Sequence, residues 1–160
     1  VGKGPGSYTG LRIGVAAAKG LCFALNIPLI GINSLQILSQ KYKAKPDEIL
    51  FPMFDARRME VYTMVMNSNK EILKKTSSEI IKQDVFDNFS KKKTWVFFGE
   101  GSVKCKEIIK GKHVKFVDDI MYPSAREMIL LSYEYFKEKK FEDIAYFEPY
   151  YLKEFISKGL

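Results

Sequence analysis

The sequence has few of the side chains that usually form metal and nucleophile sites. It contains one histidine, His113, and two cysteines, Cys22 and Cys105, in 160 residues. A histidine metal cluster, a Ser-His triad and a Cys-His dyad therefore lack their usual context. Two cysteines so far apart are typical of a reducing compartment and not of a disulfide scaffold. We therefore expect a cytoplasmic protein.

Long apolar runs are also absent. The longest candidate, from Ile13 to Leu25, is interrupted by Lys19 and two glycines. It falls short of the roughly 20 apolar residues that a membrane-spanning helix needs. We expect neither a membrane span nor a secretory signal.

Arginine is scarce in a chain of formal net charge +7. A basic surface attracts nucleic acid, which makes a nucleic-acid-binding module one alternative. Arginine binds phosphate better than lysine does, because its guanidinium forms two parallel hydrogen bonds. Most of the basic residues here are lysines, and they are scattered from Lys41 to Lys115. We interpret them as a solvated surface.

Apolar segments with helical and strand patterns alternate along the chain, which predicts an α/β fold. A capping box, Ser124 to Glu127, marks the clearest helix start. The expected helices cover residues 7–25, 34–42, 102–109 and the segment after 124, and the expected strands cover 29–32, 49–54, 60–67, 95–98 and 114–117. The strands 49–54 and 60–67 form a hairpin.

A linker with Pro46 divides the chain into two predicted parts. Residues 1–46 form the remainder of a first, dimerisation lobe, and residues 47–160 form a second α/β lobe. The aromatic, proline-interrupted tail, 146–155, is expected to be extended and to return to the first lobe.

A glycine-rich loop precedes the first helix. Gly4, Gly6 and Ser7 are candidates for an anion-binding loop, because glycines let the backbone approach a ligand and the start of a helix favours negative charge. It is not a Walker loop, since Leu11 stands where the lysine should be. A tight strand-to-helix turn is the alternative.

The first helix carries small residues at every fourth position, namely Gly10, Gly14 and Ala18. Each glycine costs about 1 kcal/mol of helix stability relative to alanine, so close packing must maintain the helix. The packing is either inside the lobe or against another protein. The candidate partner interface consists of Thr9, Leu11, Arg12, Val15, Ala18, Lys19 and Cys22.

Asp55 ends a predicted strand, with Glu60 beyond the turn. A general base or a metal ligand is one interpretation of Asp55. A pair with Arg57 or Arg58 that stabilises the hairpin is the interpretation we favour.

Three segments, 4–14 (GPGSYTGLRIG), 55–62 (DARRMEVY) and 149–153 (PYYLK), resemble the TsaB (YeaZ) family in content and order. The resemblance implies the two-lobed fold of actin and the sugar kinases, with a ribonuclease-H-like sheet in each lobe. It also implies that the chain starts after the family's opening strands and first helix. We therefore expect the first lobe to be incomplete.

The family is similar to a catalytic paralogue, TsaD, which forms threonylcarbamoyladenosine beside the anticodon of tRNA. Two histidines hold the paralogue's metal, and Ser34 and Leu38 occupy their positions here. The resemblance implies a non-catalytic subunit without a cofactor, which dimerises with the TsaD-type paralogue and helps to recruit the ATPase TsaE. Contact with tRNA is expected only through the complex, and a homodimer through the same helix stays open. The alternatives are an actin-fold ATPase, the peptidase activity once ascribed to the family, and a basic tRNA-binding module.

Overall fold

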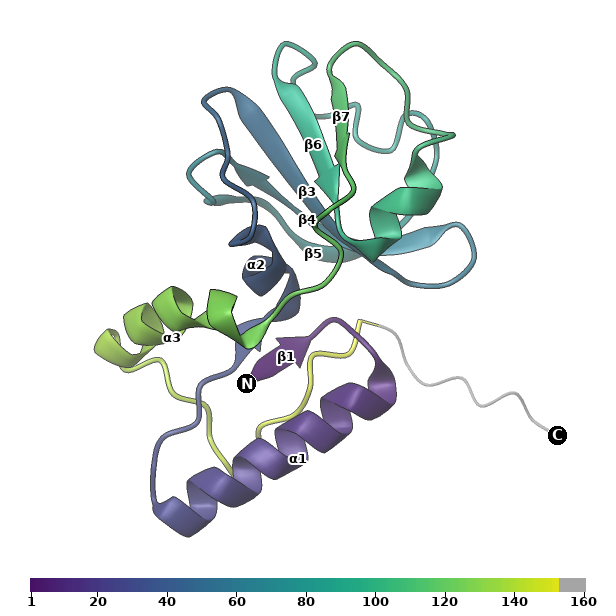
Figure 1. Ribbon diagram of the computed structural model, residues 1–160. Coiled ribbons are helices and arrows are strands. Elements are labelled where there is room, and N and C mark those ends of the chain that lie inside the picture. The colour runs from purple at the N-terminus through teal and green to yellow at the C-terminus, as the bar shows by residue number, and fades with distance from the viewer. Residues whose placement is uncertain (153–160) are drawn as a thin grey trace, which may run out of the picture.

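The computed structural model describes residues 1–152, which form two sheets of unequal size (Figure 1). In the small sheet β1 (Gly2–Gly4) pairs in parallel with β2 (Ile32–Asn33). The larger sheet has the order β5-β4-β3-β6-β7. Its strands are β3 (Glu48–Asp55), β4 (Glu60–Asn67), β5 (Ile72–Ile80), β6 (Thr94–Phe98) and β7 (Val114–Val117).

The larger sheet is buried on both faces. Alternate side chains of a strand point to opposite faces, so Trp95 and Phe97 of β6 join one core while Val96 and Phe98 join the other. The central strand β3 pairs in parallel with β6 and antiparallel with β4. The central strands therefore read as continuous apolar runs, because both of their faces are covered.

Helix α1 (Tyr8–Leu25) packs beside the small sheet (Figure 1). Ser7 caps its start by accepting a hydrogen bond from the Gly10 amide. Asn26 ends it in the left-handed conformation, with its amide bonded to the Cys22 and Phe23 carbonyls. No helix of the described part of the chain is long and apolar enough to cross a membrane.

The segment after α3 (Met128–Lys137) returns to α1 and the small sheet. Glu142 donates its amide to the Leu29 carbonyl at 2.8 Å, and Tyr150 donates its amide to the Lys3 carbonyl at 2.6 Å. This stretch, 142–151, runs along α1 in Figure 1, and we call it the C-terminal strap. The last part of the predicted tail, 153–155, lies outside the described residues.

Helix α2 (Ser34–Ser39) lies on the larger sheet, although it belongs to the predicted first lobe. Leu35 and Leu38 are fully buried in the core on one face of that sheet. Helix α2 therefore connects the small sheet, which it follows in the chain, to the core of the larger sheet. The division of the chain into two lobes near residue 46 stays a prediction.

Three predicted elements differ from the structure. The helix expected over 34–42 ends at Ser39, and the strand expected over 29–32 is reduced to Ile32–Asn33 with an isolated bridge at Leu29. The helix expected over 102–109 is a 3-10 helix, η1 (Glu100–Cys105). The helix predicted after Ser124 is confirmed: its capping box is present, and a 3-10 turn, η2 (Ala125–Glu127), leads into α3.

Close backbone packing explains why η1 differs from the expected helix. Gly99 has φ 97°, and a Cβ at that position would lie 2.1 Å from the Met53 carbonyl oxygen. The segment is thus held directly against the end of β3, where only a residue without a side chain fits.

Candidate interface on helix α1

The glycine-rich loop is fixed by contacts within the chain. The Gly4 amide donates to the Ser34 hydroxyl at 3.2 Å, and a Cβ on Gly4 would lie 2.8 Å from the Tyr150 carbonyl. Gly4 has φ 111°, which favours glycine. Gly6 and Ser7 are exposed, but Ser7 already accepts the Gly10 amide. An anion bound by this loop would have to replace these hydrogen bonds, so the anion site stays a prediction.

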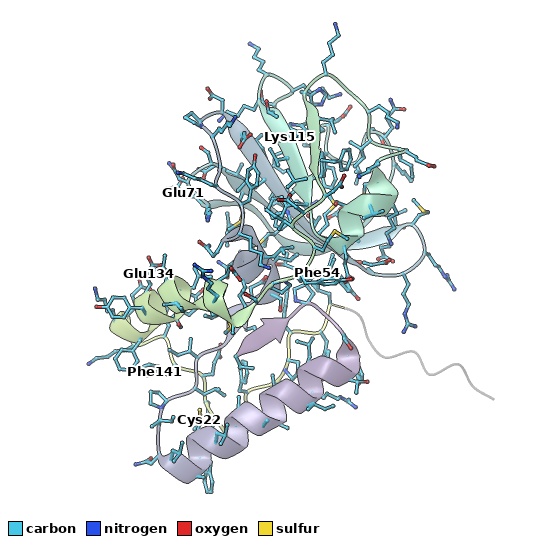
Figure 2. The ribbon with its side chains drawn as sticks, viewed as in Figure 1. Cys22, Phe54, Glu71, Lys115, Glu134 and Phe141 are labelled. Atoms are coloured by element: carbon cyan, nitrogen blue, oxygen red, sulfur yellow. The ribbon has the colours of Figure 1, made fainter. Side chains whose placement is uncertain are left out.

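One face of α1, the inner face, belongs to a small core of its own. Val15 and Cys22 are buried against Leu29 and Phe147, and Ala18 packs at the edge of that cluster. Figure 2 shows Cys22 on this side of the helix. Within the described residues the C-terminal strap covers Val15 and Cys22, which matches packing inside the lobe, and their part in a partner interface stays a prediction.

The two cations of α1 bind the strap. Lys19 donates from Nζ to the carbonyls of Ala145 and Phe147 at 3.2 and 3.0 Å. Arg12 donates from Nε to the Tyr151 hydroxyl at 3.2 Å and also bonds the Tyr8 hydroxyl. Two of the predicted interface residues therefore hold the chain's own strap. Thr9 is exposed and Leu11 is half-buried near Gly4 and Gly6.

The opposite face of α1 is apolar and exposed. We call it the outer face, and it consists of Ile13, Gly14, Ala17, Gly20, Leu21 and Ala24. Ile13 is 66% exposed and Leu21 is 62% exposed. A Cβ added at Gly14 or Gly20 would meet no atom within 4 Å. Sequence reasoning noted Gly14 but missed the face, because both sides of this helix are apolar.

Asp55 in the hairpin between β3 and β4 has one expected and one unexpected partner. The Asp55 carboxylate accepts hydrogen bonds from the Lys104 ammonium and the Arg57 amide, both at 2.6 Å. Partial burial opposes ionisation, but these two bonds outweigh it and lower the pKa of Asp55. The predicted contact with Arg57 is present through its backbone amide, and the cation that pairs with Asp55 is Lys104.

Cys105 and His113 both have packing roles among the described residues. Burial raises the pKa of the Cys105 thiol to about 11, which keeps the thiol protonated. His113 packs edge-on against Trp95, with ring centroids 4.5 Å apart. No group of three histidine, cysteine or acidic side chains within residues 1–152 could hold a metal ion.

The two positions that correspond to the paralogue's histidines have structural roles here. The Ser34 hydroxyl accepts the Gly4 amide, and Leu38 is fully buried on the larger sheet. A leucine side chain has no atom that binds a metal. These positions connect the loop before α1 to the core.

The family model described as TsaD, tRNA N6-adenosine threonylcarbamoyltransferase, matches residues 1–155. The chain belongs to this family. Relatives within the family carry the name TsaB. It is 37% identical over 134 residues to the tRNA threonylcarbamoyladenosine biosynthesis protein TsaB of Buchnera aphidicola subsp. Schizaphis graminum, covering 79% of this chain and 62% of the relative. It is 26% identical over 158 residues to the TsaB protein of Escherichia coli, covering 95% and 68%. The chain thus spans less than two thirds of the Buchnera relative.

Two solved structures share the fold. YeaZ from Pseudomonas aeruginosa matches with a TM-score of 0.76 and 25% identity, over 94% of this chain and 71% of that one. An uncharacterised P. aeruginosa protein with similarity to the peptidase YeaZ matches with a TM-score of 0.80 and 23% identity, over 95% and 71%. The expected actin-like α/β fold is confirmed by these matches and by the TsaD family.

Proposed function

We propose that this protein is a non-catalytic subunit that dimerises with a TsaD-type threonylcarbamoyltransferase and supports the formation of threonylcarbamoyladenosine in tRNA. The outer face of α1 is the observation that carries the proposal. It is an apolar helix face without an ionisable side chain, and the described residues leave it uncovered.

The composition of the outer face suits contact with another helix. Gly14, Ala17 and Gly20 add little bulk, so the backbone of a partner helix can approach to the short end of the usual 8–10 Å range. Ile13 and Leu21 supply apolar area, and burying such a side chain fully is worth about 1.5–3 kcal/mol. The exposure of this apolar helix face to water supports its role as an interaction site.

The chemistry of the described side chains supports a non-catalytic role. Leu38 and Ser34 cannot replace a pair of histidine ligands. Neither cysteine is an accessible thiol, since Cys22 and Cys105 are both buried. This argues against a peptidase that uses a cysteine nucleophile.

The remaining partners belong to the same proposal. We infer that the ATPase TsaE joins through the assembled complex and that the complex works in the cytoplasm. A homodimer would use the same outer face and would therefore compete with the TsaD-type partner. The relatives are named after threonylcarbamoyladenosine biosynthesis in tRNA. The role of this chain in that modification is therefore part of the proposal.

A matched pair of substitutions tests the interface. Leu21 on α1 and Leu130 on α3 are both exposed, at 62% and 70%. Leu21→Arg and Leu130→Arg therefore add the same charge at similar exposure to two different helices. The intact protein is mixed with a TsaD-type partner, and the complex is measured by size-exclusion chromatography with light scattering.

We expect Leu21→Arg to abolish the one-to-one complex and Leu130→Arg to leave it intact, with both variants keeping the wild-type circular dichroism. Equal binding by both variants would remove α1 from the interface. Failure of the wild-type protein to bind any TsaD-type partner would end the proposal.

A further inference from the structure

The larger sheet brings lysines from distant parts of the sequence to one end. β3, β6 and β7 are parallel neighbours, so their N-terminal ends lie at the same edge, uppermost in Figure 1. We call the lysines in the segments that lead into these strands the basic edge. They are Lys43, Lys45, Lys92, Lys93, Lys110 and Lys112. The charge that looks scattered in sequence is therefore one surface.

Backbone hydrogen bonds fix the three segments relative to one another. Thr94 donates its amide to the Asp47 carbonyl at 3.1 Å, and Trp95 donates its amide to the His113 carbonyl at 2.7 Å. The Trp95 indole also donates to the Ser90 carbonyl at 3.1 Å. Neighbouring strands lie about 4.8 Å apart, so the lysine-bearing segments are anchored close together.

The charges of the basic edge are not used within the chain. All six lysines are exposed, and none forms an ion pair with a carboxylate of residues 1–152, whereas their neighbour Lys91 pairs with Asp87 at 2.8 Å. Four acidic residues lie near these segments: Asp47 precedes β3, Glu71 precedes β5 at the side of the sheet (Figure 2), and Asp84 and Asp87 line a cavity together with Lys110. Cations outnumber these anions. Unpaired ammonium groups release counterions when they meet a polyanion, which favours binding.

We propose that the basic edge binds the phosphate backbone of tRNA while the outer face of α1 holds the TsaD-type partner. This inference rests on the proposed function, which supplies the tRNA. Lysine is a point charge, so the edge would position the RNA without reading its bases. The lysine-bearing segments contain no exposed large apolar side chain that could insert into a bilayer, which disfavours a membrane surface.

Two triple variants with equal change of charge test the proposal. One replaces a lysine from each segment of the edge, Lys43→Gln, Lys93→Gln and Lys112→Gln. The control replaces Lys75, Lys82 and Lys139, which are exposed and equally free of ion pairs among the described residues. Each variant is assembled with the TsaD-type partner. Binding of fluorescein-labelled tRNA is then measured by anisotropy between 50 and 200 mM KCl, and binding to anionic phosphatidylserine vesicles is measured in parallel.

Each phosphate contact adds about 0.7–0.9 to the slope of log affinity against log salt. We expect the edge variant to lower that slope by about 2 and to bind tRNA on the order of tenfold more weakly at 0.1 M salt. The control should change affinity by less than twofold. An equal loss of tRNA affinity in both variants would show that only net charge matters, and would overturn the proposal that the basic edge is a localised binding surface. Loss of vesicle binding alone would overturn the RNA assignment.

Sizing of the same samples separates this inference from the proposed function. If the edge variant still forms the complex and its affinity for tRNA is unchanged, the proposal that the basic edge binds tRNA is wrong, while the proposed subunit role stands. If the wild-type protein forms no complex, the proposed function fails, and the basic edge fails with it.

Discussion

The larger sheet and helix α1 differ sharply in how much of their apolar surface they bury. The sheet has a core on each face, and its aromatic rings contact one another, as in the pair Phe51 and Phe97 with centroids 4.6 Å apart. The core under α1 has only four buried side chains, and the opposite side of the helix is exposed. The sheet is therefore stable through its own packing, whereas the packing of α1 depends on the strap.

The largest expected effect is in the sheet core. Phe51 is fully buried and touches the rings of Phe86, Trp95 and Phe97. Phe51→Ala should lower the free energy of unfolding by about 3–5 kcal/mol, because it removes apolar contacts and leaves a cavity. Urea unfolding measures this loss. Phe51→Leu keeps most of the volume and should cost clearly less, and an equal cost for both would contradict the packing argument.

A smaller and more local effect is expected under α1. Phe147 covers Gly31 and joins the core of Val15 and Cys22. Phe147→Ala should cost about 3 kcal/mol, the lower end for such a truncation, because the small cluster at the surface can collapse into the space left. Hydrogen exchange should show the loss in α1 amides and leave the amides of β3 and β6 unchanged. An equal loss in both regions would show that they unfold as one unit, which would break the comparison.

The polar contacts of the strap should contribute less again. Lys19→Met keeps the aliphatic length but removes the donor to the Ala145 and Phe147 carbonyls. We expect a loss of about 1 kcal/mol in the protection of α1, as for one or two hydrogen bonds. Lys75→Met is the control, because Lys75 is exposed on β5 and has no such contact among the described residues. No difference between the two variants would mean that apolar packing alone holds the strap.

The same contrast explains what the sequence could predict. The central strands were placed correctly because their apolar runs bury both faces, as at 49–54 and 95–98. β5 was missed because it is an edge strand whose middle reads KKTSSE, with the polar and charged residues that edges use. The capping residue Ser7 and the stop signal at Asn26 predicted helix α1 almost to the residue, from Tyr8 to Leu25.

The inner and outer faces of α1 could not be distinguished from the sequence. Residues on both sides are small or apolar, and only Arg12 and Lys19 are charged. Those two cations suggested the rim of an interface, but they bind the strap. The strap arrives from more than 120 residues along the chain, and local periodicity carries no information about such a contact. The basic edge could not be predicted from the sequence for the same reason, since only the parallel pairing of β3, β6 and β7 brings its lysines together.

The smallest expected effect is at the hairpin surface of the sheet, where Asp55 accepts hydrogen bonds from Lys104 and the Arg57 amide. These bonds hold the pKa of Asp55 below its ordinary value of 3.8 despite partial burial. A carboxyl with a lowered folded-state pKa adds stability above its unfolded pKa, and this stability is lost as pH falls through the folded-state pKa. Asp55→Asn should therefore destabilise slightly at pH 7 and not at all well below the folded-state pKa. Paired urea unfolding curves at pH 7 and in acid measure the difference. A gap between wild type and variant that is the same at both pH values would show that the carboxylate charge contributes nothing, and that the hairpin, like the core beneath it, is held by packing.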